Sequence, residues 1–427
     1  MQIKAVNLLA NSLRVLPVAA LAALLVSCGG GGGTAAPTDA PLSISTATDT
    51  LTTAFGGTGG GYWDGAGGDG GGGAGADGGG GAGDGEFVQF HIDFGTLKFS
   101  WTVLRSEYGI AGQTGSLNLV KDLVNGGYKA VGTGAEQANI FVSKAGQVTG
   151  SIPLVVGGST IYMTYNAMRY KDAVTNFNQV AGTYVLVALV RSVNTGANPE
   201  TTVGTININN DGSGRFCPKS GYSDTCNNGF PVTVGFDDPA NPKLIKVTST
   251  DAHALIGYGV TRTNDQNVQT AFLDISFTDN ALGRRTGNVA MAKLSTINFN
   301  PANFTGAWYY AAIDTGSTSR SMGTGQASFN GTTYKTLDSG GSTACNSSNT
   351  AYDQGTIGNA STYESTFTSA GYLFSSLPGG NPGPAIMIPI STDLLAIARL
   401  GTSAPGSHGN YALLRRYNTN PGVAPCP

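Results

Sequence analysis

Short runs of alternating apolar and polar residues fill the chain after residue 86. The run Val203–Asn209 alternates with a period of two, and Asn210-Asp211-Gly212, a sequence typical of hairpin turns, follows it. Similar alternating runs lie at 232–236, 271–277, 327–329 and 386–390. Because a strand directs successive side chains to opposite faces, this pattern predicts an all-β fold. We expect tandem antiparallel modules, built either as β-barrels or as β-sandwiches.

Residues 116–126 fit two interpretations. Leu117, Val120 and Val124 would share one face of a helix, whereas Leu117 and Leu119 also alternate as in a strand. The Asn-Gly-Gly at the end of this segment suits a hairpin turn. We therefore favour the strand.

A weak internal repeat indicates how the modules are arranged. Residues 180–185 read VAGTYV and residues 304–309 read FTGAWY, and a cysteine follows each segment. The repeat predicts one β module of roughly 120 residues that occurs twice. We place β module 1 at residues 177–299 and β module 2 at residues 300–427, after an N-terminal β region at residues 87–176.

The first 27 residues are typical of a secretory signal peptide. Lys4 and Arg14 are their only charged residues. The apolar stretch Val15–Val26 would form a helix of about 18 Å, which is too short to cross a hydrocarbon layer of about 30 Å. We therefore expect a cleaved leader at residues 1–27 and no permanent transmembrane helix there.

The leader ends in Leu25-Val26-Ser27-Cys28, which resembles the lipobox of bacterial lipoproteins. The resemblance implies cleavage before Cys28 and acylation of this residue, with palmitate among the acyl chains, so that the lipid on Cys28 binds the chain to a membrane. Several acyl chains on one residue give a stable anchor. Gly29 stands where aspartate would indicate retention in the inner membrane, so the resemblance implies the outer membrane.

Residues 28–86 are predicted to be a lipid anchor followed by a disordered Gly/Asp-rich linker. Residues 29–86 contain 24 glycines, seven acidic residues and no basic residue. A Gly-rich coil of this length has a root-mean-square reach of about 42 Å. The Gly-Asp runs lack the large apolar residue that each repeat of a calcium-binding β-roll requires, so we predict a solvated spacer.

The composition argues against nucleic-acid binding and against metal or redox chemistry. Only 11% of the residues are charged and the net charge is −3, so the chain does not supply the basic face that nucleic acid requires. With three histidines and five cysteines, it offers little for metal or redox chemistry. We predict no metal site, no cofactor and no nucleic-acid partner.

Candidate catalytic residues are few. Residues 338–341 read Asp-Ser-Gly-Gly, which resembles the segment around the nucleophile of chymotrypsin-like proteases. That family has glycine where Leu337 stands, and His91 and His253 lack the surroundings of its catalytic base. We interpret Ser339 as part of a hairpin turn and predict no catalytic residue and no enzymatic activity.

Other polar and aromatic groups also have structural interpretations. We interpret Asp237-Asp238 as an Asx turn and Arg284-Arg285 as solvated strand ends. His253 is placed on a strand opposite apolar neighbours. Trp308-Tyr309-Tyr310 suits either a carbohydrate-binding or protein-binding face or the core of a sheet, and we favour the core.

The four cysteines after the linker are predicted to form disulfides, because an exported chain folds in an oxidising compartment. Cys217 and Cys226 are nine residues apart and could meet across a tight hairpin. Cys345 would then pair with Cys426. Cross-links between 217 and 345 or between 226 and 426 would contradict this pairing and the module boundary near residue 300.

The chain loosely resembles uncharacterised Gly-rich secreted lipoproteins of Gram-negative bacteria. It is also distantly similar in layout to surface lipoproteins whose small β-barrels display binding loops. We therefore expect an outer-membrane lipoprotein, displayed at the cell surface, with a non-catalytic role in binding a protein or glycan or in structure. The alternatives are an envelope hydrolase acting on glycans and a purely structural component of the envelope or matrix. The leader does not decide between the periplasmic and the external side.

Overall fold

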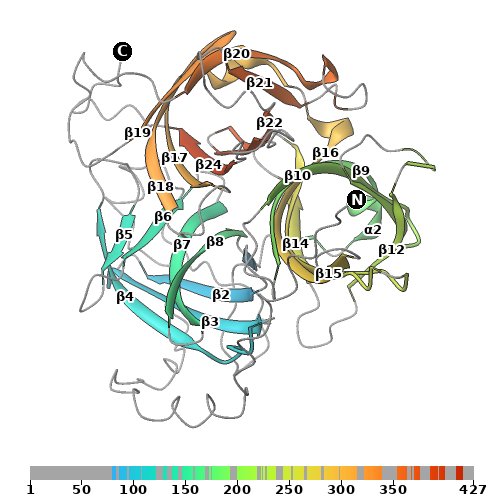
Figure 1. Ribbon diagram of the computed structural model, residues 1–427, viewed down its shortest axis with the longest axis horizontal. Helices are drawn as coiled ribbons and strands as arrows, with labels where there is room; N and C mark the ends of the chain where they lie inside the picture. The colour runs from blue at the N-terminus through green and yellow to red at the C-terminus, as the bar shows by residue number, and fades with distance from the viewer. Residues whose placement is uncertain are drawn as a thin grey trace, which may run out of the picture. The chain divides into compact units, whose positions relative to one another are not determined.

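The protein is all-β, as predicted, and its strands close into barrels (Figure 1). A computed structural model describes residues 79–416 except for 83–85, 94–95, 107, 122–127, 132–136, 143–146, 157–158, 169–172, 175, 193–199, 219–222, 224, 227, 237–243, 252, 264–266, 280–282, 298, 315–321, 339–352, 363–366, 368–369, 376–384, 393 and 400–409. The described strands form three closed barrels of eight antiparallel strands each. The choice between barrels and sandwiches is thus decided in favour of barrels.

Barrel 1 contains the N-terminal β region. Its strands are β1 (Gly79–Ala82), β2 (Glu86–Asp93), β3 (Lys98–Ser106), β4 (Thr114–Lys121), β5 (Tyr128–Val131), β6 (Gln137–Val142), β7 (Gln147–Val156) and β8 (Ser159–Met168). Strand β4 confirms the strand interpretation of the segment that begins near residue 116.

The predicted linker, which ends at residue 86, is too long at its C-terminal end, because Gly79–Ala82 form strand β1 of barrel 1. Its glycines pair with strands on both sides, Gly81 with Phe87 of β2 and Gly80 with Ala167 of β8, and so close the barrel. The Gly-rich composition of β1 indicates only that this segment cannot form a hydrophobic core of its own. A barrel that lacks one strand offers two unpaired edges, and backbone pairing with them needs no side chains. The ring of Tyr165, opposite Ala82, fills the interior instead and lies 4.3 Å from the ring of Phe90.

Barrels 2 and 3 lie within the two predicted modules. Barrel 2 consists of β9 (Gly182–Ser192), β10 (Glu200–Ile208), β11 (Ser213–Pro218), β12 (Phe230–Gly235), β13 (Ile245–Thr248), β14 (Ile256–Thr263), β15 (Gln269–Asp279) and β16 (Gly283–Lys293). Barrel 3 consists of β17 (Gly306–Asp314), β18 (Met322–Asn330), β19 (Thr333–Asp338), β20 (Asp353–Asn359), β21 (Gly371–Ser375), β22 (Ala385–Ser391), β23 (Leu394–Arg399) and β24 (Asn410–Arg416). The short helical segments are α2 (Phe177–Val180), η3 (Leu294–Thr296), η4 (Pro301–Phe304) and η5 (Ala360–Thr362).

The two repeated segments begin barrels 2 and 3 in the same way. An asparagine caps the short helix before each barrel: Asn176 accepts a hydrogen bond from the second residue of α2, and Asn300 accepts one from the second residue of η4. The first strand of each barrel then begins at a glycine with positive φ, +138° at Gly182 and +135° at Gly306. A side chain at either position would be strained, which explains why both segments contain glycine there.

A buried aromatic side chain ties each short helix to its barrel. The Tyr184 hydroxyl donates to the carbonyl oxygen of Val180 at 2.6 Å, and the Trp308 indole nitrogen donates to that of Phe304 at 2.8 Å. Trp308 is fully buried, so it belongs to the core as predicted.

The interior of each barrel is a separate apolar cluster, and a fourth cluster joins outward-facing residues of all three barrels. Strands β16 and β22 are consequently buried on both faces over most of their length. In β22, Ile386 and Ile388 belong to the fourth cluster, whereas Met387 belongs to the interior of barrel 3.

Candidate functional site

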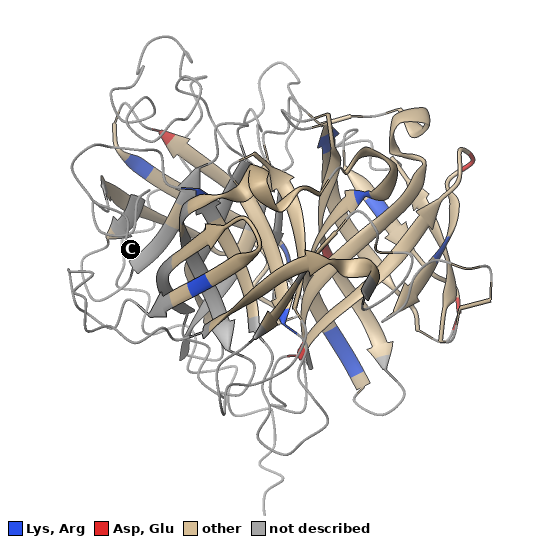
Figure 2. Cartoon of the chain, turned by 90° about the horizontal axis from the view of Figure 1, so that it is seen from above, with Lys and Arg blue, Asp and Glu red and all other residues tan. Residues whose placement is uncertain are grey.

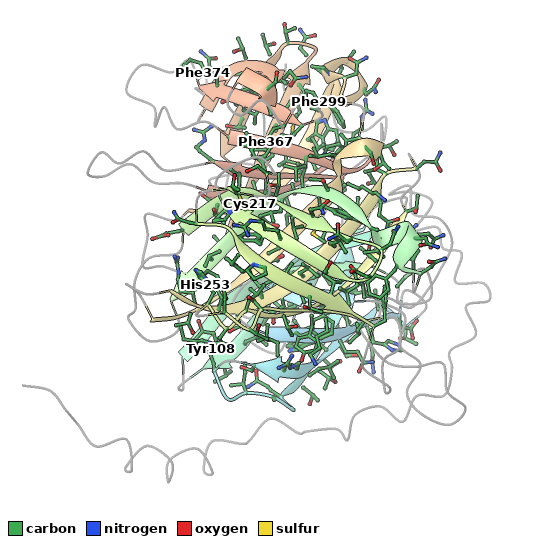
Figure 3. All side chains as sticks on the ribbon, turned by 90° about the vertical axis from the view of Figure 1, so that its right-hand side faces the viewer. Tyr108, Cys217, His253, Phe299, Phe367 and Phe374 are labelled. Atoms are coloured by element: carbon green, nitrogen blue, oxygen red, sulfur yellow. A yellow bond between two sulfur atoms is a disulfide. The ribbon has the colours of Figure 1, made fainter. Side chains whose placement is uncertain are left out.

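The two ends of barrel 2 differ. Neighbouring strands run in opposite directions, so α2 and the start of β9 lie at one end, and the connections β9–β10, β11–β12, β13–β14 and β15–β16 lie at the other. At the first end, Val180 of α2 is fully buried in the interior cluster and Phe177 packs against it. We call the opposite end the mouth of barrel 2, defined by Glu200, Phe216, Phe230, His253, Phe277 and Arg285. Figure 3 labels His253 of the mouth and Cys217 of β11.

The strand register directs a charged pair into the mouth. Arg285 of β16 lies opposite Phe277 of β15, on the face that carries the interior residue Ile275. Glu200, the first residue of β10, lies opposite the interior residue Val190 of β9. Directly opposed residues of an antiparallel pair share a face, so Arg285 and Glu200 both face the inside of the barrel and flank β9.

Arg285 and Glu200 form an ion pair with unequal burial. The Arg285 Nη2 lies 3.1 Å from the Glu200 Oε2, and the two side chains are 9% and 57% exposed. The Arg285 Nε is buried and has no hydrogen-bond partner among the residues that the structure describes, and the Arg285 Cζ lies 6.0 Å from the centre of the Phe277 ring. The prediction that Arg284-Arg285 are solvated strand ends is thus wrong for Arg285. Its position on the inward face, with an acidic partner, explains its burial.

Aromatic rings form the other side of the mouth. Phe216 of β11 and Phe230 of β12 lie opposite each other, with ring centres 5.1 Å apart. The His253 ring stacks on Phe230 with a centre-to-centre distance of 4.3 Å. His253 lies in the β13–β14 connection and not on a strand as predicted, because the chain turns there: the Ala254 N–H donates to the Asp251 carbonyl oxygen at 3.0 Å.

A hydrogen-bonded acid holds the His253 ring in place. The Asp251 Oδ2 lies 2.8 Å from the His253 Nδ1, and the Ser249 hydroxyl donates to the Asp251 Oδ1 at 2.8 Å. Burial raises the pKa of Asp251, but the hydrogen bonds from His253 and Ser249 outweigh it and leave this pKa below its usual value. The serine bonds the carboxylate and not the imidazole, so these residues do not have the arrangement of a nucleophile and its base.

The Cys217–Cys226 disulfide closes the β11–β12 connection at the mouth and confirms this part of the predicted pairing. Its Cα atoms are 5.8 Å apart. The turn is packed tightly, since a Cβ on Gly229 would lie 2.2 Å from the Cys226 sulfur. Arg215 adds a hydrogen bond from its Nη2 to the Gly229 carbonyl oxygen at 2.9 Å.

Several other predicted residues lie outside the described part of the chain: Cys28, Cys345, Cys426, Ser339, His408 and Asp237-Asp238. The lipidation of Cys28 and the Cys345–Cys426 pairing stay predictions. His91 lies on β2 of barrel 1.

Below the mouth, side chains fill the space that inward-facing glycines leave. Gly257 and Gly259 of β14 lie opposite the interior residues Ile275 and Leu273. A Cβ on Gly259 would lie 2.0 Å from the Phe272 carbonyl oxygen and 2.5 Å from the Leu273 Cδ2. This part of the interior is therefore a packed core.

Charged side chains are sparse elsewhere as well. Lys and Arg are scattered over the described strands in Figure 2, and only Arg284-Arg285 and Arg415-Arg416 are adjacent there. Within the described ranges, no three His, Cys, Asp or Glu residues are grouped so that they could hold a metal ion. None of the helices in this part of the chain is long and apolar enough to cross a membrane.

The chain has distant structural likenesses to solved proteins. No protein-family model matches the chain, and no curated protein matches it. A protein with unknown function from Nostoc punctiforme is similar at 11% identity and a TM-score of 0.22, over 55% of this chain and 95% of that one. Transferrin Binding Protein B from Haemophilus parasuis is similar at 10% identity and a TM-score of 0.22, over 78% of this chain and 66% of that one. The intact TbpB with N and C lobes has 9% identity, the same TM-score and the same two coverages. Scores this low carry no argument about function.

Proposed function

We propose that the protein is a lipid-anchored binding protein of the bacterial outer membrane and that it binds its ligand at the mouth of barrel 2. The observation that carries this proposal is the inward-facing Arg285–Glu200 pair beside the aromatic rings of the mouth. Among the described residues, the buried arginine has an N–H without a hydrogen-bond partner and lies beside the partly buried ring of Phe277, and such an arrangement combines apolar contact area with a directional polar group.

The arrangement of the carboxylates favours binding over glycan hydrolysis. Glycoside hydrolysis uses two carboxyl groups that flank the scissile bond. Glu200 is paired with Arg285, and Asp251 is paired with His253. Glu200 of the mouth and the neighbouring Asp251 are therefore each engaged with a cation or a potential cation.

The anchor is proposed from the sequence. Cys28 would carry the lipid, and the linker that follows would hold the barrels away from the membrane surface. Cys28→Ala should abolish palmitate labelling and release the protein from membranes. Continued membrane partition of this variant would contradict the anchor, and protease treatment of intact cells would show which side of the membrane the barrels face.

Radical footprinting by mass spectrometry tests the binding role on the full chain. The probes are a panel of aromatic acids, their amides and neutral oligosaccharides. A probe that binds should protect the segments 216–218, 228–230, 253–255 and 283–285 at the mouth and leave the segments 177–180 and 209–212 at the opposite end unprotected. Protection of the opposite end alone, or of no segment by any probe, would overturn the proposed role of the mouth.

A further inference from the structure

We propose that the mouth of barrel 2 takes a small aromatic or apolar molecule that ends in a carboxylate, and that this carboxylate displaces Glu200 from Arg285. The inference rests on the proposed binding role of the mouth and adds the chemical class of the ligand. Glu200 then acts as an internal competitor that occupies the arginine when no ligand is bound.

Glu200 engages one of the two N–H groups on the guanidinium edge that faces it. Nη2 and Nε lie on the same edge of an arginine fork and match the two oxygens of a carboxylate. The Arg285 Nη2 lies 3.1 Å from Glu200, longer than the 2.7–2.9 Å usual for charge-assisted bonds, and the Nε has no partner in the described part of the chain. A carboxylate aligned with this edge would satisfy both donors.

The difference in burial identifies which partner can leave. The Arg285 side chain is held between β9 and β15 and is 9% exposed, whereas the Glu200 side chain is 57% exposed. A buried charge that loses its partner is strongly unfavourable, so a ligand that displaces Glu200 has to supply a negative charge itself. A carboxylate does so, and an amide of the same shape does not.

The surroundings of Arg285 specify the rest of the ligand. Phe277 lies next to Arg285 in the register, and Phe216 and Phe230 form the aromatic side of the mouth. Since side chains already fill the interior beside Gly257 and Gly259, the apolar part is short. A single ring on a short stem fits these conditions better than a long acyl chain.

The test compares 3-phenylpropionate with 3-phenylpropionamide, which differ only in the charged group. Binding to the full chain is measured by calorimetry in a buffer free of carboxylates, with footprinting to locate each probe. The wild-type protein should bind the acid about tenfold more tightly than the amide, since one hydrogen bond to a charged group contributes about this much. Glu200→Gln should raise the affinity for the acid about tenfold and change that for the amide less than twofold.

Two further variants complete the design. Glu86→Gln, at the first residue of β2 in barrel 1, is the matched control and should bind both probes as the wild type does. Arg285→Lys keeps the positive charge but lacks the fork and should lose most of the preference for the acid. If Arg285→Lys does not fold, a salt titration of the wild type replaces it, and added salt should weaken binding of the acid but not of the amide.

The outcomes separate the two proposals. Equal affinity for acid and amide at the mouth, or an unchanged acid affinity in Glu200→Gln, would overturn the carboxylate inference and leave the mouth as a binding site. Absence of protection at the mouth with every probe of the wider panel would overturn both.

Discussion

Replacing Cys217 and Cys226 together by serine should destabilise barrel 2. The disulfide closes a loop of ten residues, counted from 217 to 226. Loop-entropy arithmetic gives such a loop about 2.7 kcal/mol at 25 °C. Residual structure in the unfolded chain lowers this figure, so it is an upper value.

Hydrogen exchange measured by mass spectrometry is the suitable assay, because each barrel can be followed by its own peptides. Trp fluorescence would not report on barrel 2, since the three tryptophans of the chain, at positions 63, 101 and 308, all lie outside residues 182–293. A loss of 2.7 kcal/mol corresponds to about a hundredfold faster exchange of amides that exchange only when the barrel unfolds. We expect this change in β14, β15 and β16, and a much smaller one in β2 and β3 of barrel 1.

One result would refute the reasoning. If exchange accelerates only in β11 and β12 while β14 to β16 keep their protection, the disulfide orders the mouth locally and does not stabilise the barrel as a unit. The single variants Cys217→Ser and Cys226→Ser serve as controls, because each removes the same cross-link and should match the double variant in β14 to β16.

Three further predictions follow from individual contacts. Tyr184→Phe removes the hydroxyl bonded to the Val180 carbonyl oxygen and should cost about 1.5 kcal/mol in chemical denaturation, with a change below 0.5 kcal/mol arguing against a structural role of this bond. Gly259→Ala places a methyl group against a neighbouring backbone oxygen and should lower stability by about 3 kcal/mol; a thermal midpoint equal to that of the wild type would contradict the packed interior. The pKa of Asp251 is lowered in the folded protein, so its stabilising effect is present above the unfolded value of about 3.9 and is lost as the pH falls through the folded value. The difference in unfolding free energy between the wild type and Asp251→Asn should therefore shrink from pH 6 to pH 3. If this difference does not change with pH, the contact between Asp251 and His253 is not the cause of the stabilisation.

Local features were readable from the sequence because they depend on residues close together in the chain. The alternation in Ala271–Phe277 and the Asn-Asp-Gly turn after Ile208 predict hairpins, and both belong to antiparallel strands in the structure. The Cys217–Cys226 disulfide joins residues nine positions apart, so its spacing was sufficient to predict it.

Barrel closure by β1 could not be predicted in this way. The glycines of this strand carry no apolar pattern, and the unpaired edges of β2 and β8 that bind it exist only once the rest of barrel 1 has formed.

Only the tertiary structure decides which face of each strand turns into the barrel, and therefore which residues form the candidate site. In β16 both faces are apolar, with Val289 and Met291 on one and Ala290 and Ala292 on the other, so the sequence does not show which face turns inward. A shift of one residue in register would exchange the two faces and turn Arg285 outward. Pairing with β9 and β15 excludes that shift, and it is this pairing that buries the arginine inside the mouth opposite Phe277.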